Sequence, residues 1–362
     1  KGGNPLNLSL PEHKVVNLSH RTEWVDTALE AKGWATYKGI LKNGGPYSEV
    51  RPEQEHLIPL IGDALMEGYE NIIVCDRLGD DERWANLVPL RFSDYIDADD
   101  LLEGVLRKSD YLGEVRAVFH LGACSDTTET DADYLLANNF AFTKELAKWT
   151  LQMRGRFVYA SSAATYGDGA SGMDDSEDDL ARYRPLNMYA YSKHLFDCYA
   201  QRNGMARSII GLKYFNIFGP NENHKGNMRS VVNKAFHQIV QTGRVNLFKS
   251  YHQDYADGHQ ERDFLYVKDA VDMTLHLANL PLAGGLFNIG SGVASTWVDL
   301  VNAIFVALER DSHIDFIDMP DELREKYQYH TCANISRLRS AGYNNQVSSL
   351  AEAVGDYVAS YL

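Results

Sequence analysis

The sequence contains no run of eighteen apolar residues, which excludes a membrane-spanning helix on length alone. Its first residues, Lys1 to Pro5, also lack the apolar stretch of a secretory signal. With 362 residues, 44% of them hydrophobic, the chain is long enough for a large core with one or two domains. We therefore expect a cytoplasmic globular protein. An organelle matrix stays open as an alternative, because the chain does not begin with methionine and N-terminal processing would explain this.

The sequence is also short of basic residues and of clustered cysteines. Lys and Arg total 35 against 50 Asp and Glu, and a nucleic-acid binder normally presents a basic face, so we expect no nucleic-acid partner. Neither the cysteines nor the twelve histidines show the spacing of a metal site. We predict no metal, no disulfide framework and a reducing compartment. The four cysteines are Cys75, Cys124, Cys198 and Cys332.

Short apolar runs alternate with helix-length segments from residue 69 onward. Two amphipathic segments, 134–153 and 187–203, separate the apolar runs and have the apolar periodicity of helices. Strands that alternate with helices predict right-handed βαβ units and a parallel sheet, so we expect a Rossmann-like, doubly wound α/β fold. The expected strands are 70–76, 114–120, 155–161 and 208–216.

The later part of the chain predicts a smaller C-terminal α/β lobe that binds the substrate and is interwoven with the first domain. Its expected helices are 226–243, 296–309 and 350–362, and its expected strands are 286–290 and 313–317. We accordingly divide the chain into an N-terminal segment of unknown role, a nucleotide-binding domain and a mostly substrate-binding lobe. The divisions are 1–56, 57–215 and 216–362.

A tyrosine and a lysine occur four residues apart in the expected helix 187–203. This spacing places Tyr189 and Lys193 on one helical face. A free tyrosine has a pKa of about 10, and a neighbouring ammonium group favours the phenolate, so the pair predicts a usable acid and base for a hydroxyl proton. Ser162 follows the third strand, at the edge where open α/β sheets bind their ligands. The structural alternative for Ser162 is local capping of the backbone.

Several motifs resemble the heptose 6-epimerases of the extended short-chain dehydrogenase/reductase class, in the NAD-dependent epimerase/dehydratase family. The likeness runs from about residue 69 to the C-terminus. The string Gly-Ala-Cys-Ser-Asp-Thr-Thr-Glu and the string His-Lys-Gly-Asn-Met are narrow features of the heptose enzymes, whereas Tyr-x-x-x-Lys is common to many sugar-nucleotide enzymes. The motifs are 120–129, 161–167, 185–193, 214–220, 224–228 and 262–264.

The resemblance implies a catalytic set of Ser162, Tyr189, Lys193 and Lys225, with Lys225 as a second acid or base opposite Tyr189. Without the resemblance, Lys225 has the alternative of a solvated loop lysine. The implied substrate-binding residues include Arg262, for which Asp263 or Asp269 is an alternative structural partner, and Tyr327, which could equally be a core aromatic. The full substrate set is Ser125, Asn216, His224, Arg262 and Tyr327.

The expected cofactor is NADP, with NAD as the alternative. Asp76 ends a strand, where an acid commonly binds the adenosine ribose, and two arginines follow that could accommodate a 2′-phosphate. Lys193 would also hold the nicotinamide ribose. The cofactor-binding set is Asp76, Arg77, Arg83, Asn139 and Lys193.

The sequence departs from the family pattern in its N-terminal region. A glycine fingerprint should follow the first strand and lie near residues 46–57, but proline and acidic residues occur there instead. The segment Lys14–Leu18 is a candidate first strand, yet Ser19–Thr22 after it contains no glycine. Three interpretations stay open: another geometry of cofactor binding, a non-catalytic assembly subunit, or an N-terminal stretch that differs from the natural chain.

The intact motifs favour an enzyme that inverts C6 of an ADP-heptose through transient oxidation by bound NAD(P). An epimerase acting on another nucleotide sugar is an alternative, whereas Ala163 and Ala164 after Ser162 oppose a 4,6-dehydratase, which needs an acidic pair there. The alternative from another class is a non-catalytic subunit of a larger assembly. The expected partners are a nucleotide-sugar substrate and further copies of the chain in a homo-oligomer.

Overall fold

A computed structural model describes residues 13–16, 71–79, 82–107, 112–176, 179–281, 283–324 and 327–362. The position expected for a glycine fingerprint, 46–57, lies outside these residues, as does most of the N-terminal segment 1–56. The candidate first strand is present as β1 (His13–Val16).

The larger part of the molecule is built on a seven-stranded sheet in the order β10-β6-β5-β4-β1-β2-β3. Every neighbouring pair is parallel. Apolar residues fill both faces, and all five residues of β2 are buried, as a strand covered on two sides requires. The strand order reverses between β1 and β4, which is where such sheets bind ligands. The other strands are β2 (Ile72–Asp76), β3 (Asp94–Asp97), β4 (Val115–His120), β5 (Arg156–Ser162), β6 (Ile209–Tyr214) and β10 (Gly285–Ile289).

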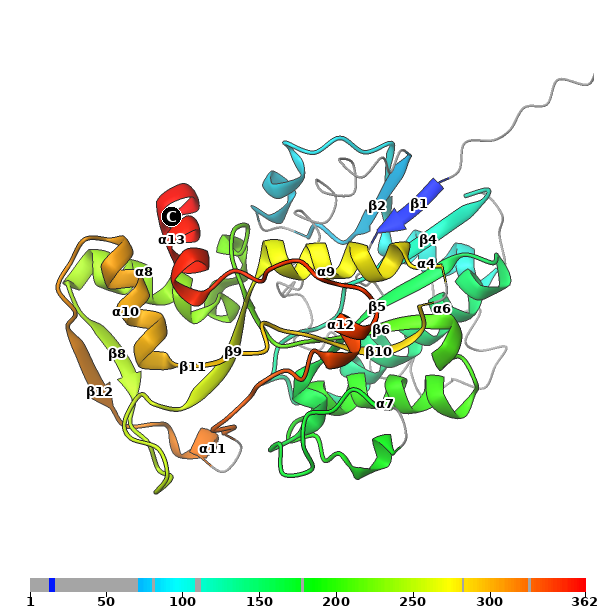
Figure 1. Ribbon diagram of the computed structural model, residues 1–362. Coiled ribbons are helices and arrows are strands. Elements are labelled where there is room, and N and C mark those ends of the chain that lie inside the picture. Colours follow the sequence, from blue (N-terminus) through cyan, green and yellow to red (C-terminus); the bar gives the residue numbers. More distant parts are fainter. Residues whose placement is uncertain are drawn as a thin grey trace, which may run out of the picture.

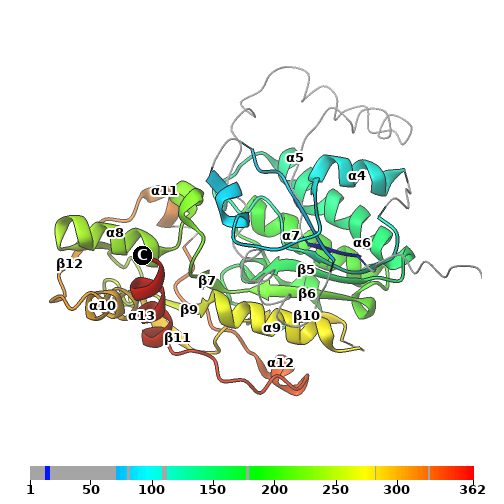
Figure 2. The same ribbon diagram turned by 90° about the horizontal axis from the view of Figure 1, so that it is seen from above.

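Helices cover both faces of this sheet (Figures 1 and 2). Three of them, α4 (Ala98–Leu106), α6 (Phe142–Gln152) and α7 (Met188–Arg202), share one apolar core with the sheet. On the opposite face, α9 (Val267–Asn279) and α12 (Ser336–Ser340) contribute to a second core. The expected Rossmann-like α/β fold is therefore confirmed.

A smaller lobe lies to one side of the seven-stranded sheet and has a core of its own (Figure 1). It contains a three-stranded sheet, β11-β9-β7, and a two-stranded parallel sheet, β12-β8. Its strands are β7 (Asn216–Phe218), β8 (Val245–Phe248), β9 (Glu261–Tyr266), β11 (Ala294–Thr296) and β12 (Ile314–Ile317). Its helices are α8 (Val231–Thr242), α10 (Trp297–Ala307), α11 (Asp321–Arg324) and α13 (Leu350–Tyr361).

The expected helix 226–243 begins later than predicted, at Val231. Ser230 caps this helix by accepting the N–H of Asn233 through its side chain. The preceding residues form the short 3-10 segment η6 (Asn223–Met228), which is kinked at Gly226, where φ is +52°. This difference matters because Lys225 consequently lies in an irregular segment instead of a helix. Two expected strands, 208–216 and the strand at 286–290, are present to within a few residues as β6 and β10.

Three further findings concern membrane-spanning helices, cysteines and metal-ligating side chains. Within the described residues, every helix is too short or too polar to cross a bilayer. All four cysteines are free, three of them buried and Cys332 half-buried. No cluster of three metal-ligating side chains occurs in the parts of the chain that the structure describes.

Candidate active site

The site begins where β5 ends and α7 starts. Ser162 is the last residue of β5, and its Oγ accepts the N–H of Ala164 at 3.1 Å, so the local capping considered from the sequence does occur. Its side chain also lies close enough to that of Tyr189, in the first turn of α7, to lower the pKa of the phenol. Asn187 caps α7 by accepting the N–H of Ala190, which fixes where the helix begins. The expected pair of Ser162 and Tyr189 is therefore brought together.

Loss of contact with water affects the pKa of Tyr189. Removal from water raises the pKa of its phenol above the ordinary value, and the neighbouring Ser162 side chain partly offsets this. The sequence interpretation expected Lys193 to lower this pKa. In the structure the buried Lys193 ammonium instead donates to the carbonyl of Ala160 at 2.8 Å, and the effect of burial on Tyr189 prevails.

A neutral histidine lies beside Lys193. Burial and the Lys193 charge lower the pKa of His120 to about 3. The Thr143 hydroxyl donates to the carbonyl of Asn139 at 2.7 Å, so it accepts from His120 Nε2, 2.8 Å away. His120, at the carboxyl end of β4, thus adds no second charge next to Lys193.

Asn139 uses its side chain to hold other protein groups. Its Oδ1 accepts the N–H of Cys124 at 2.8 Å, and its Nδ2 donates to the Cys124 carbonyl at 2.9 Å and to Ser192 Oγ at 3.0 Å. It lies in η2 (Leu136–Ala141), a stretch of π-helix, a feature that often marks functional sites. The geometry therefore gives the Asn139 amide a role in joining the loop after β4 to α7. Ser125, which follows Cys124 in the sequence, has a buried Oγ without a hydrogen-bond partner among the described residues.

The expected cofactor residues after β2 lie close together. The buried Asp76 carboxylate accepts the N–H of Arg77 at 2.5 Å. Arg77 forms an ion pair with Asp99 at 2.8 Å, and burial lowers its pKa to about 10. Arg83 is also buried, in η1 (Glu82–Leu87), and its Nη1 donates to the Arg77 carbonyl at 3.1 Å. Arg83 is therefore a fixed charge and not a mobile loop arginine.

Lys225 is only 1% exposed, which excludes the solvated loop lysine considered from the sequence. Burial lowers the pKa of its ammonium well below the ordinary range. Next to it, His224 Nδ1 accepts from the Asn86 side chain at 3.2 Å. This contact joins η6 to η1 across 138 residues of sequence, so the loop that carries Lys225 meets the segment that follows the expected cofactor residues.

The expected substrate residues of the small lobe gather around Arg262. Its buried guanidinium stacks on the rings of Tyr327 and Trp297, at 5.0 and 5.7 Å, and donates to the carbonyls of Glu261 and Gln328. Tyr327 is half-buried, and its hydroxyl accepts from Trp297 Nε1 at 2.9 Å. The acidic partners Asp263 and Asp269 considered for Arg262 do not appear among these contacts. Asn216 is exposed at the start of β7, on the strand next to the one that carries Arg262.

The similarity of this chain to known proteins identifies its family. Residues 60–290 match the model of the NAD dependent epimerase/dehydratase family. The chain belongs to this family. Over 295 residues it is 49% identical to the ADP-L-glycero-D-manno-heptose-6-epimerase of Nitratidesulfovibrio vulgaris, a match that covers 82% of this chain and 91% of the relative.

Solved structures of the same fold agree with the family assignment. The ADP-L-glycero-D-manno-heptose-6-epimerase of Helicobacter pylori aligns with a TM-score of 0.71 at 20% identity, over 96% of both chains. The UDP-glucose 4-epimerase of Thermus thermophilus, solved with NAD, aligns with a TM-score of 0.66 at 22% identity, over 84% of this chain and 95% of that one. At these identities the likeness concerns the fold.

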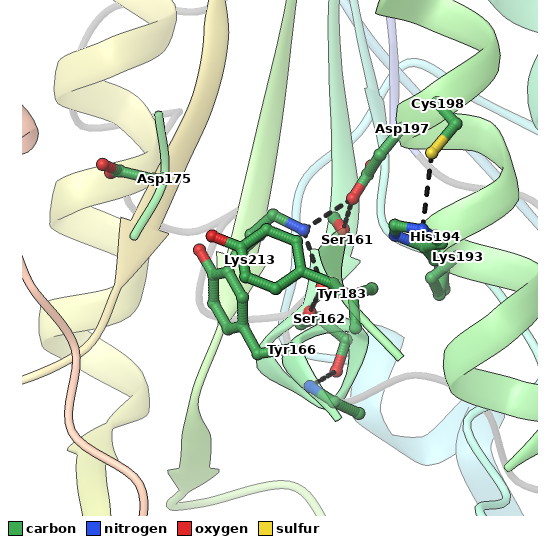
Figure 3. Close-up of polar contacts among 12 residues, drawn as sticks. Ser161, Ser162, Tyr166, Asp175, Tyr183, Lys193, His194, Asp197, Cys198 and Lys213 are labelled. Carbon is green, nitrogen blue, oxygen red and sulfur yellow. Dashed lines mark hydrogen bonds and ion pairs between the residues drawn. The ribbon is translucent and has the colours of Figure 1, made fainter. Parts of the chain in front are cut away.

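The structure of this family member also contains a buried network that the sequence interpretation missed (Figure 3). The fully buried Lys213 on β6 donates to Asp197 at 2.7 Å and to Thr165 at 2.6 Å. Asp197 also accepts from the hydroxyls of Tyr159 and Ser161, at 2.9 and 2.8 Å. The network ties α7 to the end of β5, where Ser162 lies. Two signals were available in the sequence: Lys213 is a charge within an apolar strand, and Asp197 continues the four-residue spacing of Tyr189 and Lys193.

Proposed function

We propose that this chain is a nicotinamide-dependent sugar-nucleotide epimerase that inverts C6 of an ADP-activated heptose. The observation that carries the proposal is that Ser162, at the carboxyl end of β5, lies close to Tyr189 in the first turn of α7, one helical turn from Lys193. The relatives that are 38 to 49% identical over most of the chain and named as heptose epimerases support the choice of sugar.

A nicotinamide cofactor, when bound, would take a hydride from the substrate carbon and return it. The residues around the reversal of strand order fit such a group: Asp76 lies at the end of β2, and Lys193 lies beside the end of β5. Asp76, Arg77 and Arg83 would hold the adenosine end, and Lys193 the nicotinamide ribose. Asn139 would act indirectly, by fixing the backbone of Cys124, which precedes Ser125, and by binding Ser192 on α7.

Tyr189 and Lys225 would exchange protons with the substrate hydroxyl, each with one of the two epimers. Removal of the hydroxyl proton accompanies loss of a hydride from the same carbon, which gives a transient ketone. The ketone turns in the site, so that the hydride would return to the other face of the carbon while a proton is restored to the oxygen. Burial favours the neutral form of both groups, so the pair can hold a proton on Tyr189 and accept one on Lys225. A single cycle then moves the substrate hydroxyl proton to Lys225 and a proton from Tyr189 to the product, and proton exchange with solvent restores the neutral pair.

Two other groups would bind the substrate in this reaction. Ser162 lies where its hydroxyl can stabilise the substrate oxygen while negative charge develops on it. Arg262 would bind the diphosphate through charge-assisted hydrogen bonds. Its stacking between Trp297 and Tyr327 fixes the plane of the guanidinium and therefore the direction of its donors.

The proposal is tested by incubating the purified chain with ADP-D-glycero-D-manno-heptose and either nicotinamide cofactor, and following inversion at C6 by NMR. UDP-glucose and UDP-N-acetylglucosamine serve as competing substrates. Inversion of the heptose alone supports the proposal, and faster inversion of a UDP-sugar overturns the choice of substrate. Absence of cofactor binding at millimolar concentration would favour the second candidate, a non-catalytic subunit, which the missing glycine fingerprint suggests.

We predict that the chain binds NADP more tightly than NAD, and that the ratio of the two affinities depends on how far Asp99 neutralises the charge of Arg77. Asp99 neutralises part of this charge at 2.8 Å. Asp99→Asn should therefore tighten binding of NADP relative to NAD by about 1 kcal/mol, or roughly fivefold in Kd. Fluorescence titration with both reduced cofactors measures the ratio. Asp94→Asn, which removes an acid whose carboxylate accepts the N–H of Tyr95, is the matched control and should leave the ratio unchanged.

The division of the chain and its assembly are also part of the proposal. We assign residues 57–215 mainly to cofactor binding and 216–362 mainly to the substrate, with β10 of the second part completing the large sheet. Residues 1–56 contribute at least β1 to that sheet. A homo-oligomer is expected, and light scattering after size-exclusion chromatography measures its mass.

A further inference from the structure

The loop that carries Lys225 is anchored by a buried carboxylate. Glu222 directly precedes η6 and is 6% exposed. Its carboxylate accepts three hydrogen bonds, from Ser230 N at 2.5 Å, Ser230 Oγ at 2.6 Å and the Tyr357 hydroxyl at 2.8 Å. The N–H of Lys225 in turn donates to the Glu222 carbonyl at 3.1 Å. The position of the Lys225 backbone is therefore tied to the side-chain contacts of Glu222.

Tyr357 joins this anchor to a second one. Its hydroxyl donates to Glu222 and accepts from the amide of Asn233 at 3.0 Å. The same amide donates to Asn223 Oδ1 at 2.9 Å, within η6 itself. Asn233 and Tyr357 are 0% and 1% exposed, so water cannot replace these bonds easily. One hydroxyl on the last helix, α13, thus connects both fixed points of the loop.

The loop has little regular structure to hold it otherwise. Gly226 breaks the helical geometry directly after Lys225, and Arg229 Nε donates to the Gly226 carbonyl at 2.8 Å. α13 packs against α10 in the small lobe (Figure 1). Its position is therefore set by the core of that lobe and not by η6. The contacts of Glu222, Asn223 and Gly226, together with the contact between His224 and Asn86, therefore contribute to where Lys225 lies.

We propose that Tyr357 is a positioning residue for proton exchange at Lys225. The inference rests on the proposed function and deepens it, because it assigns a role to a residue 132 positions away in sequence from the group it positions. Misplacement of a reacting group by about 1 Å can cost on the order of 100-fold in rate. Loss of the Tyr357 hydroxyl leaves Glu222 with one donor fewer and Asn233 with one acceptor fewer, so the loop gains freedom.

The test separates the two half-reactions. Wild-type and Tyr357→Phe proteins with bound cofactor are mixed with each epimer separately, and the rise in reduced nicotinamide is followed by stopped-flow absorbance. Reduction should be slowed about tenfold with only one epimer, the same one that is affected by Lys225→Met. Equal slowing with both epimers, or none with either, overturns the proposal, because a merely structural role would not distinguish them.

Tyr343→Phe is the matched control. Tyr343 is equally buried, and its hydroxyl also donates to a carboxylate, that of Asp272 at 2.7 Å, but it lies in the other core. This variant should leave both half-reactions unchanged. If Tyr357→Phe does not fold, Glu222→Gln replaces it, since it disturbs the same hydrogen bonds, and the same one-sided effect is expected.

A readout without catalysis distinguishes this proposal from the proposed function. The reaction of the Lys225 amine with acetic anhydride is measured by mass spectrometry in the three proteins. Labelling should be several-fold faster in Tyr357→Phe than in wild type and unchanged in Tyr343→Phe. Unaltered labelling overturns the positioning role even if the wild-type chain is an epimerase. Faster labelling supports the positioning of Lys225 even if no epimerisation is found.

Discussion

The two groups proposed to exchange protons lie in regions of different construction. Tyr189 is in the first turn of a fifteen-residue helix that packs on a parallel sheet, and an ion pair between Asp197 and Lys213 ties this helix to the end of β5. Lys225 is in a kinked 3-10 segment of the small lobe, held by Glu222 and its hydrogen-bonded neighbours. One group is positioned by regular structure, and the other by side chains.

Burial has opposite effects on the pKa values of these two groups. It raises that of the Tyr189 phenol and lowers that of the Lys225 ammonium, because it disfavours the charged form of each. A neutral phenol can give a proton and a neutral amine can take one. Burial therefore favours the phenol over the phenolate and the amine over the ammonium, which gives the proposed exchange one proton donor and one proton acceptor.

The largest expected effect comes from removing the acid. Tyr189→Phe deletes the phenolic hydroxyl, and loss of a positioned acid or base typically costs 100- to 10,000-fold, so we expect turnover to fall by about 1,000-fold. The ring and its packing remain, so circular dichroism and the melting temperature should stay close to those of wild type. Turnover is measured by the NMR assay with the heptose substrate. Near-normal turnover would remove Tyr189 from the catalytic set.

The second prediction tests the ion pair that fixes the helix-based region. Asp197→Asn leaves the fully buried Lys213 without its carboxylate, and breaking a buried pair in this way costs about 3–5 kcal/mol. Urea unfolding should therefore show a large fall in the free energy of unfolding. The control is Asp315→Asn, which breaks the exposed pair of Asp315 with Arg244 and should change stability little. Equal effects of the two variants would contradict a special role for the buried pair.

The difference between the two regions also explains what the sequence could predict. The four-residue spacing of Tyr189 and Lys193 is a local pattern, and strand periodicity placed Ser162 at the end of β5, so this region followed from local rules. The assignment of Lys225 depended on a family resemblance. The contact between Glu222 and Tyr357 spans 135 residues, and no local periodicity encodes such a pairing.

Asn139 shows a further limit of sequence reasoning. The resemblance implied a cofactor residue, whereas the structure shows an amide whose bonds join Cys124 to Ser192. A motif indicates that a residue type is needed at a position, but not whether it faces the ligand or supports a neighbour. The missing glycine fingerprint is a second example. Its expected position, 46–57, lies outside the described residues, so the way in which the cofactor is bound without it stays a prediction.

The smallest expected effect concerns the loop-based region and has a defined pH dependence. Because the folded pKa of Lys225 is lowered, the unfolded chain binds more protons below the ordinary lysine pKa of about 10.4, and stability lost to this burial is regained as pH rises toward that value. Lys225→Met removes the buried amine but keeps an apolar side chain of similar length. The variant should therefore melt a few degrees higher than wild type at neutral pH, where about 2–4 °C corresponds to ~1 kcal/mol in domains of 150–250 residues. This gain should shrink as pH is raised toward 10. A gain that does not vary with pH would mean that packing, and not the buried amine, distinguishes Lys225 from Tyr189.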